Sequence, residues 1–300
     1  MKKKNKIPFV LRCIRWAMPK LEVVSPALAG NWGVKLFMTP FRTYPTAYEK
    51  EVLEQASVTM MEHKGEQLHL YHWQNEGPNV LFLHGWAGRG LQGAYFAESL
   101  RHKGYNVFSL DFPAHGASSG KQTNVVEMTE VVHQLTRKWG GFHAVIGHSL
   151  GGIVTLNSMS EGLMAERVVL IGVPADSAFI VEQFLEKIRG GKVIEKALYT
   201  YIQKKFQRDF HEFDALNIVK RLPKKFPTLV IHDDKDREVP VDLSKRLNFV
   251  LPDSRMVLTK GWGHSRILSN PEVVMKVEEF ISQGEIAQTI QEEMNEEKTS

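Results

Sequence analysis

Cysteine and long apolar runs are scarce in this chain of 300 residues. Acidic residues are scarce in its first fifty positions. Cys13 is the only cysteine, which excludes an internal disulfide and a metal cluster built from several cysteines. A chain without disulfides fits a reducing, cytoplasmic setting. The apolar run from Ile7 to Leu11 is too short for a secretory signal or for the roughly 20 residues of a membrane span. We therefore expect a cytoplasmic globular protein.

The scarcity of acidic residues gives the amino end a strong positive charge. The first fifty residues hold ten lysines and arginines against Glu22 and Glu49. We expect residues 1–55 to be a basic arm that packs on or beside the core, because Pro8 and Pro19 limit a regular amphipathic helix. The alternative is weak association with the anionic inner face of a membrane, through Phe9, Leu11, Ile14 and Trp16. Nucleic-acid binding is not indicated, since no recognition motif accompanies the lysines.

The order of apolar segments predicts one α/β core with an insertion. Residues 26–54 resemble an extended lead-in, and residues 57–62 and 67–73 flank a Lys64-Gly65 turn as a hairpin. From Asn79 short apolar strands alternate with helices, which predicts a mostly parallel sheet covered by helices on both faces. The predicted core comprises residues 56–173 and 227–283, interrupted by a strandless helical cap at 174–226. Residues 284–300 form an acidic tail.

The segment around Ser149 predicts the site. Ala144 to Ile146 forms a short buried strand, and a helix follows from Ile153. Between them, Gly147-x-Ser149-x-Gly151 places a serine on a strained turn where larger neighbours would collide. The helix that follows directs its free N–H groups towards the serine oxygen. This strand–turn–helix pattern is that of a nucleophile elbow.

A general base and an acid follow later strands. Three aspartates, Asp233, Asp234 and Asp236, come after the strand at 228–232, and each is a candidate acid. His264 follows the last strand between glycines, while His211 at the end of the cap is its rival. A histidine can take the serine proton and a carboxylate can fix its tautomer.

The segment His84-Gly85-Trp86 predicts the oxyanion site. It follows the first long apolar strand, where glycine lets the backbone approach a ligand. The N–H groups of Trp86 and Leu150 are expected to converge on the oxyanion. We expect the substrate to contact His84, Gly85, His148, Phe179 and Phe184.

Taken together, these motifs resemble the α/β-hydrolase superfamily, in its serine esterase/lipase-like form with a helical cap. The resemblance covers roughly residues 66–281. It rests on His84-Gly85-Trp86, Asp111-Phe112-Pro113-Ala114-His115-Gly116, Gly147-His148-Ser149-Leu150-Gly151, Asp236 before Val239-Pro240, and Gly263-His264. Ala114 stands where the family commonly has glycine. The position just before Val-Pro implies Asp236 as the acid, so that the catalytic residues are Ser149, Asp236 and His264.

The resemblance implies a serine hydrolase that cleaves the carboxylic ester of a small-molecule substrate through an acyl-enzyme, with no metal or organic cofactor. Apolar cap residues (Phe179, Phe184, Phe206) favour a partly apolar substrate. Acyl transfer and carbon–carbon bond hydrolysis are alternatives that would use the same triad. A non-catalytic binding module is a third, against which the complete set of residues argues.

Overall fold

The computed structural model describes residues 8–223 and 225–296, and within them the chain forms one eight-stranded sheet. Its strand order is β1-β2-β4-β3-β5-β6-β7-β8. The β1–β2 and β2–β4 pairs are antiparallel, and all other neighbours are parallel. The strands are β1 (Ser57–His63), β2 (Glu66–Trp73), β3 (Asn79–Leu83), β4 (Asn106–Leu110), β5 (Phe142–His148), β6 (Ala165–Ile171), β7 (Thr228–Asp233) and β8 (Ser254–Thr259). The predicted hairpin and the predicted mostly parallel sheet are confirmed.

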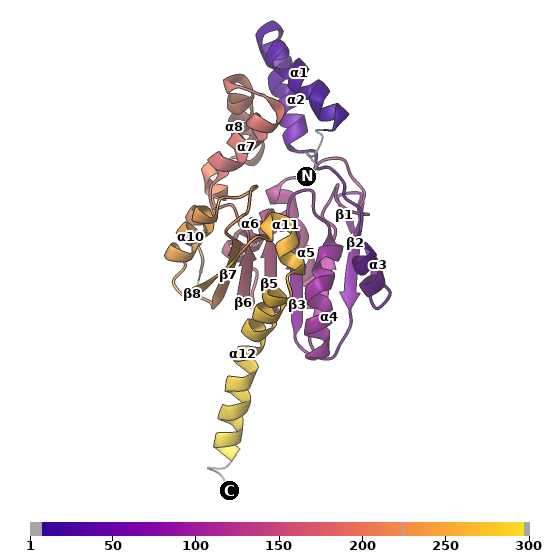
Figure 1. Cartoon of the computed structure of the whole chain (residues 1–300), viewed down its shortest axis with the longest axis vertical. Helices are drawn as coiled ribbons and strands as arrows, with labels where there is room; N and C mark the ends of the chain where they lie inside the picture. Colours follow the sequence, from indigo (N-terminus) through magenta and orange to yellow (C-terminus); the bar gives the residue numbers. More distant parts are fainter. Residues whose placement is uncertain (1–7, 224, 297–300) are drawn as a thin grey trace.

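Helices cover both faces of the sheet (Figure 1). Along β3, Leu81 and Leu83 pack on one face with α5 (Val125–Trp139) and α6 (Leu150–Ser160). The intervening Val80 and Phe82 pack on the other face with α4 (Ala94–His102) and α12 (Pro271–Glu296). Successive strand residues point to opposite faces, so an apolar strand can serve both layers. The predicted α/β class with two helical layers is confirmed.

The segment between β6 and β7 is helical. It contains α7 (Ser177–Ile188), α8 (Lys192–Phe206), the 3₁₀ turn η2 (Phe210–Phe213) and α9 (Ala215–Val219). Helices α7 and α8 stand beyond the carboxyl edge of the sheet (Figure 1). After β7 the chain continues through α10 (Val241–Val250), β8, α11 (Gly263–Arg266) and η3 (Ile267–Ser269) to α12. The helical backbone of α12 continues to Glu296, beyond the point where we placed the start of the tail.

The amino-terminal prediction was wrong in its secondary structure. The chain forms α1 (Phe9–Val24), α2 (Pro26–Phe37) and α3 (Ala47–Leu53) rather than an extended lead-in. Pro8 precedes the first turn and Pro26 occupies the first turn of α2, a place where proline fits a helix. Pro19 lies inside α1, next to Met18, which is buried in the cluster with the cap residues. Within residues 8–223 and 225–296, no helix is long and apolar enough to cross a bilayer.

Candidate active site

Ser149 lies at the turn between β5 and α6 with φ 53° and ψ −121°. Such a positive φ is costly for a residue with a side chain, and neighbouring elements must hold it. The Ser149 N–H donates to the Ile171 carbonyl oxygen on β6 at 2.8 Å. A Cβ atom at Gly147 would lie 2.6 Å from the Gly152 Cα. The steric argument for glycine beside the serine therefore holds at this position.

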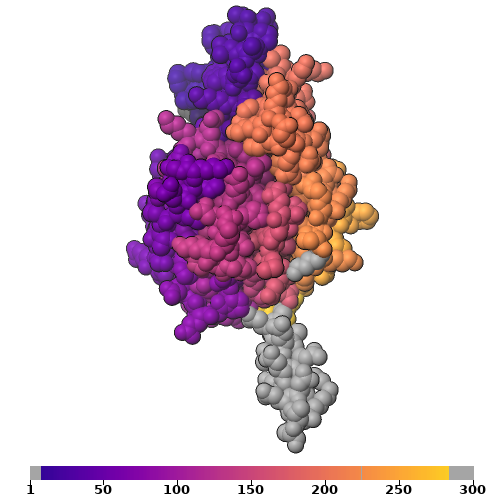
Figure 2. Space-filling model, turned by 180° about the vertical axis from the view of Figure 1, so that it is seen from behind, coloured from indigo at the N-terminus to yellow at the C-terminus, as the bar shows by residue number. Residues whose placement is uncertain are grey.

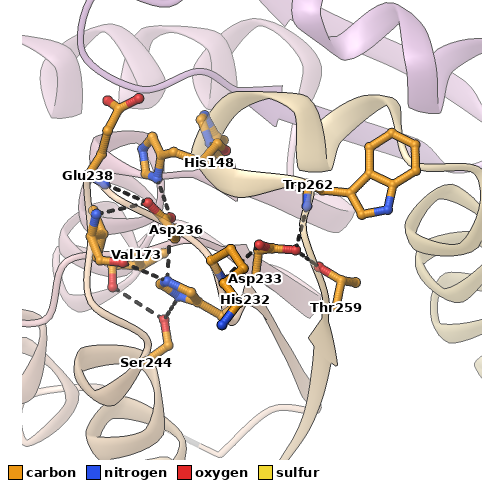
Figure 3. A network of polar contacts seen from close by, with 12 residues as sticks. His148, Val173, His232, Asp233, Asp236, Glu238, Ser244, Thr259 and Trp262 are labelled. Atoms are coloured by element: carbon orange, nitrogen blue, oxygen red, sulfur yellow. Dashed lines mark hydrogen bonds and ion pairs between the residues drawn. The ribbon is translucent and has the colours of Figure 1, made fainter. Parts of the chain in front are cut away.

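His264 is joined to Asp236 by a hydrogen bond of 2.7 Å between Nδ1 and Oδ2. His264 lies in α11, after β8, and Asp236 lies in the turn after β7. The Asp236 Oδ1 accepts N–H donors from Glu238 at 2.8 Å and Val239 at 3.0 Å (Figure 3). A carboxylate can accept but not donate, so the proton of this bond is on His264 Nδ1, which leaves Nε2 free to act as a base.

A second histidine, His232, contacts the Asp236 carboxylate. His232 on β7 is fully buried, and its Nε2 lies 3.4 Å from Asp236 Oδ2 and 2.9 Å from the Val239 carbonyl oxygen. Its Nδ1 meets the Ser244 hydroxyl of α10 at 2.7 Å (Figure 3). Burial raises the pKa of Asp236, but hydrogen bonds from His232 and His264 and the Val239 N–H outweigh burial and hold that pKa well below its usual value. Asp236 is therefore a stable anion.

The other two aspartates differ in their surroundings. Asp233 is buried, and its Oδ2 accepts from the Thr259 hydroxyl at 2.8 Å and the Trp262 N–H at 3.0 Å (Figure 3). Burial raises the pKa of Asp233, while these bonds and other backbone donors lower it below its usual value overall. Asp234 is exposed and faces Lys235 at 4.0 Å. Asp233 thus ties the loop that carries His264 to the end of β7, and neither of these two carboxylates contacts the imidazole.

The loop after β3 approaches the nucleophile closely. A Cβ atom at Gly85 would lie 2.7 Å from the Ser149 Cβ, so only glycine fits there without a shift. Among the described residues, neither the Trp86 N–H nor the Leu150 N–H has an acceptor. Two N–H groups left free beside a nucleophile are suited to bind a developing oxyanion.

Two buried histidines hold this loop in place. His84 accepts the Phe112 N–H at 3.1 Å through Nε2, and its Nδ1 lies 2.8 Å from the Gly85 carbonyl oxygen. His115 accepts the Ala87 N–H at 3.1 Å. Burial lowers the pKa of His84 to about 4 and that of His115 to about 3, so both rings are neutral and can accept these hydrogen bonds. His84 is thus a support of the loop, and it does not line the cavity where we expected substrate contact.

His148 lies beside the base. Its ring is 4.8 Å from that of His264, and its Nε2 lies 3.0 Å from the His264 carbonyl oxygen. Burial, with the neighbouring His264, lowers the pKa of His148 to about 3. A neutral His148 adds no positive charge beside His264 when that ring takes up a proton. The His148 Nδ1 has no partner among the described residues.

A cavity of about 270 Å³ brings much of the predicted site together. Ser149, His264, Gly85, Trp86 and His148 line it. The remaining wall mixes apolar and polar groups, and several of its polar side chains were not among the predicted site residues. These include Thr43, Thr46, Glu49, Arg89, Gln92, Tyr95, Glu238 and Arg266.

The amino-terminal segment therefore forms part of the cavity wall. Arg89 donates to both carboxylate oxygens of Glu49 at 2.7 and 2.8 Å, and this pair is almost wholly buried. The Thr43 hydroxyl donates to the Ala87 carbonyl oxygen at 3.1 Å. The Thr46-x-x-Glu49 capping box is a sequence signal for the start of α3 that our sequence analysis did not use. Nothing in that signal indicated contact with the loop after β3.

Two predicted substrate contacts do not line the cavity. Phe184 packs edge-to-face on Phe37 of α2, with ring centres 5.0 Å apart. Phe179 packs against the core cluster that also contains Val173. Apolar cap residues serve the contact between the cap, the core and the amino-terminal helices, so they are no guide to substrate polarity.

The rival histidine does not line this cavity. His211 lies in η2, where its Nδ1 is 3.3 Å from Asp214 Oδ2 and 3.4 Å from the Ser177 hydroxyl. The same ring nitrogen faces both partners, so this serine, histidine and aspartate cannot act as a base relay. His211 is an exposed cap residue.

The chain is similar in sequence to known proteins. The model of the alpha/beta hydrolase family matches residues 80–277. Human protein ABHD12B is 24% identical over 223 residues, which cover 68% of this chain and 60% of that protein. The pimeloyl-[acyl-carrier protein] methyl ester esterase of Nitrosomonas europaea is 24% identical over 236 residues, covering 65% of this chain and 92% of that protein.

Solved structures are similar in fold. The Pyrococcus furiosus esterase Pf2001 superposes with a TM-score of 0.61 at 20% identity, covering 81% of this chain and 98% of that chain. The thioesterase domain from the curacin biosynthetic pathway has a TM-score of 0.56 at 15% identity, with 75% and 99% covered.

Proposed function

The chain belongs to the alpha/beta hydrolase family, and we propose that it is a serine hydrolase that cleaves carboxylic esters through an acyl-enzyme intermediate. The observation that carries the proposal is the pairing of His264 with the anionic Asp236 at 2.7 Å, in a cavity that also exposes Ser149 on its strained turn. Similarity to proteins named as esterases supports the same reaction class.

In the proposed reaction the same groups first form the acyl-enzyme and then hydrolyse it. Ser149 Oγ attacks the ester carbonyl carbon while its proton passes to His264 Nε2. Asp236 stabilises the resulting imidazolium and keeps its tautomer. The N–H groups of Trp86 and Leu150 receive the oxyanion. The imidazolium then protonates the departing alcohol, and a water molecule, deprotonated by His264, releases the acid from Ser149.

The cavity favours a small and polar ester. Its volume of about 270 Å³ lies below the roughly 300–1,000 Å³ of sites that enclose drug-sized ligands. Arg266 and Glu238 stand at its wall together with the Arg89–Glu49 pair. A long alkyl chain packed against Arg266 and Glu238 would displace water from these exposed charged groups. We therefore replace the expectation of an apolar substrate by a short acyl group with a polar or charged portion.

A panel of p-nitrophenyl esters from acetate to palmitate tests both parts of the proposal. We expect kcat/KM to be highest for the short esters, and Ser149→Ala to abolish turnover of all of them. A preference for long chains with turnover still dependent on Ser149 would refute the substrate class alone. Equal turnover by Ser149→Ala would refute the serine mechanism.

A further inference from the structure

Helix α1 is apolar on two opposite sides. Its inner side buries Ile14 and Met18 in a cluster with cap residues that include Val181 and Ile194. Its outer side exposes Phe9 by 76%, Trp16 by 68% and Val24 by 82%. A helix that merely covers a protein has a polar outer side, and gathered exposed apolar residues indicate an interaction site.

The outer residues form one continuous row. Phe9, Cys13, Trp16, Lys20 and Val24 follow one another at intervals of three or four residues, which places them on one face of the helix. Val23 (83% exposed) and Leu28 at the start of α2 (54% exposed) extend the apolar surface. We call these seven residues the outer row. At 16 residues, α1 is about 24 Å long, suited to lying along an interface.

The charges around the outer row are positive. Arg12 and Lys20 are exposed, and the Lys20 Nζ lies 3.4 Å from the centre of the Trp16 ring. The one acidic residue of α1, Glu22, faces inward, where Oε1 lies 3.4 Å from the Ile194 N–H. In the sequence, Lys2, Lys3, Lys4 and Lys6 come just before α1. Tryptophan beside lysine, with no acidic residue facing outward, is the composition that binds anionic lipid headgroups.

Helix α1 is held in this orientation by the cap. The Arg15 guanidinium donates to the carbonyl oxygens of Glu186 at 3.0 Å and Lys187 at 2.8 Å, near the end of α7. These carbonyls carry the negative end of the helix dipole, so a cation is favoured there. The outer row is therefore already ordered in the free protein and loses little further freedom on binding.

Helix α1 lies at the cap end of the molecule. Figure 1 shows α1 and α2 beyond the carboxyl edge of the sheet, and Figure 2 shows the indigo amino-terminal segment at one end of the molecule. We infer that the outer row docks on an anionic lipid surface and brings the cap end of the molecule, with the proposed active site beneath it, against that surface. Packing and membrane contact were alternatives in the sequence, but here they use different faces of the same helix: Ile14 faces the cap, and Phe9 and Trp16 face outward.

Co-sedimentation of the full chain with vesicles tests this inference. Vesicles of phosphatidylcholine alone are compared with vesicles that also contain phosphatidylglycerol. We expect binding only to the anionic vesicles, weakening as added salt shortens the Debye length to about 3 Å at 1 M. Because Cys13 is the only cysteine and is exposed, an environment-sensitive fluorophore attached there should shift to shorter wavelength on binding.

A matched pair of variants locates the contact. Trp16→Ser/Val24→Ser should lower the vesicle partition coefficient about tenfold or more, since two large side chains no longer enter the interface. Phe249→Ser is the control, because Phe249 on α10 is 89% exposed but lies outside the outer row. Circular dichroism and turnover of a soluble ester check that both variants fold.

Three results would overturn the inference. These are no sedimentation with anionic vesicles, an unshifted fluorophore at Cys13, or an equal loss of binding in both variants. A concentration-dependent dimer that the double variant abolishes, without vesicle binding, would assign the outer row to a second copy of the chain instead. The fluorophore result is independent of any substitution, so a misfolded variant would still leave the inference open to refutation.

Discussion

Replacing Asp236 by asparagine should disable the proposed base without removing a side chain. Asp236 accepts two backbone N–H groups through Oδ1 and the His264 ring through Oδ2, which also lies 3.4 Å from His232 Nε2. Asparagine has only one accepting oxygen, and turning its NH₂ group towards Glu238 and Val239 would set donor against donor twice. The oxygen should therefore stay with the backbone, and the NH₂ group should face His264. The ring must then accept at Nδ1, which moves its proton to Nε2.

The magnitude follows from this change of tautomer. A base protonated at Nε2 cannot take the serine proton, and the equivalent change in serine proteases lowers kcat by about 10⁴-fold. Asp233→Asn replaces one of the oxygens that accept hydrogen bonds from Thr259, Gly261 and Trp262 before His264. We therefore expect kcat to fall about tenfold and the free energy of unfolding to fall by about 1–3 kcal/mol. Asp234→Asn, at an exposed carboxylate, is the matched control and should act like the unmodified chain.

Steady-state turnover of p-nitrophenyl acetate measures the three variants, and the downfield NMR signal of the His264 Nδ1 proton reports the tautomer. Loss of that signal in Asp236→Asn alone should accompany the largest loss of kcat. Equal losses in all three variants, or a dominant loss at Asp233, would refute the assignment of the acid.

Two further predictions concern the buried histidines and the loop after β3. In the folded chain the pKa is about 4 for His84 and about 3 for His115 and His148. As the pH falls below about 6.5, only the unfolded chain therefore binds protons at these histidines. The free energy of unfolding should fall by about 2 kcal/mol per histidine between pH 7 and pH 5. Urea titrations at both pH values measure this, and equal stability would contradict neutral burial. Gly85→Ala should lower kcat by about 10- to 100-fold, because its Cβ would press on the nucleophile at 2.7 Å; unchanged kinetics would show that this approach is not needed.

Much of the core could be predicted because its signals are local. The alternating helices and apolar strands specify the sheet, and Val125–Trp139 is one of the helices between its strands. Chain order also placed Ser149 and His264 at one edge of the sheet. These predictions depend on periodicity and on which residues follow a strand, and both can be read along the sequence.

The amino-terminal region could not be predicted in the same way. Its prolines suggested extended chain, yet Pro8 and Pro26 occupy helix starts and Pro19 is tolerated inside α1. The roles of Glu49 and Arg89 depend on a contact between segments 40 residues apart. Periodicity carries no information on such a contact.

Substrate contacts were the least predictable part of the site. Phe184 has the spacing of a buried helical residue, but that spacing does not reveal what covers it, and the structure places it on Phe37. Chain order alone did not separate Asp233, Asp234 and Asp236, and only the resemblance to the family favoured Asp236. The structure separates them by their partners: Thr259 and Trp262 for Asp233, solvent for Asp234, and His264 for Asp236.

The most direct test of the proposed mechanism is to react the full chain with a fluorophosphonate and to map the adduct by mass spectrometry. An activated serine should give one phosphonyl group per chain, located on Ser149. The Ser149→Ala variant should remain unlabelled and should hydrolyse esters at least 10³-fold more slowly. A chain that does not react, an adduct on another residue, or a Ser149→Ala variant with undiminished turnover would contradict the account.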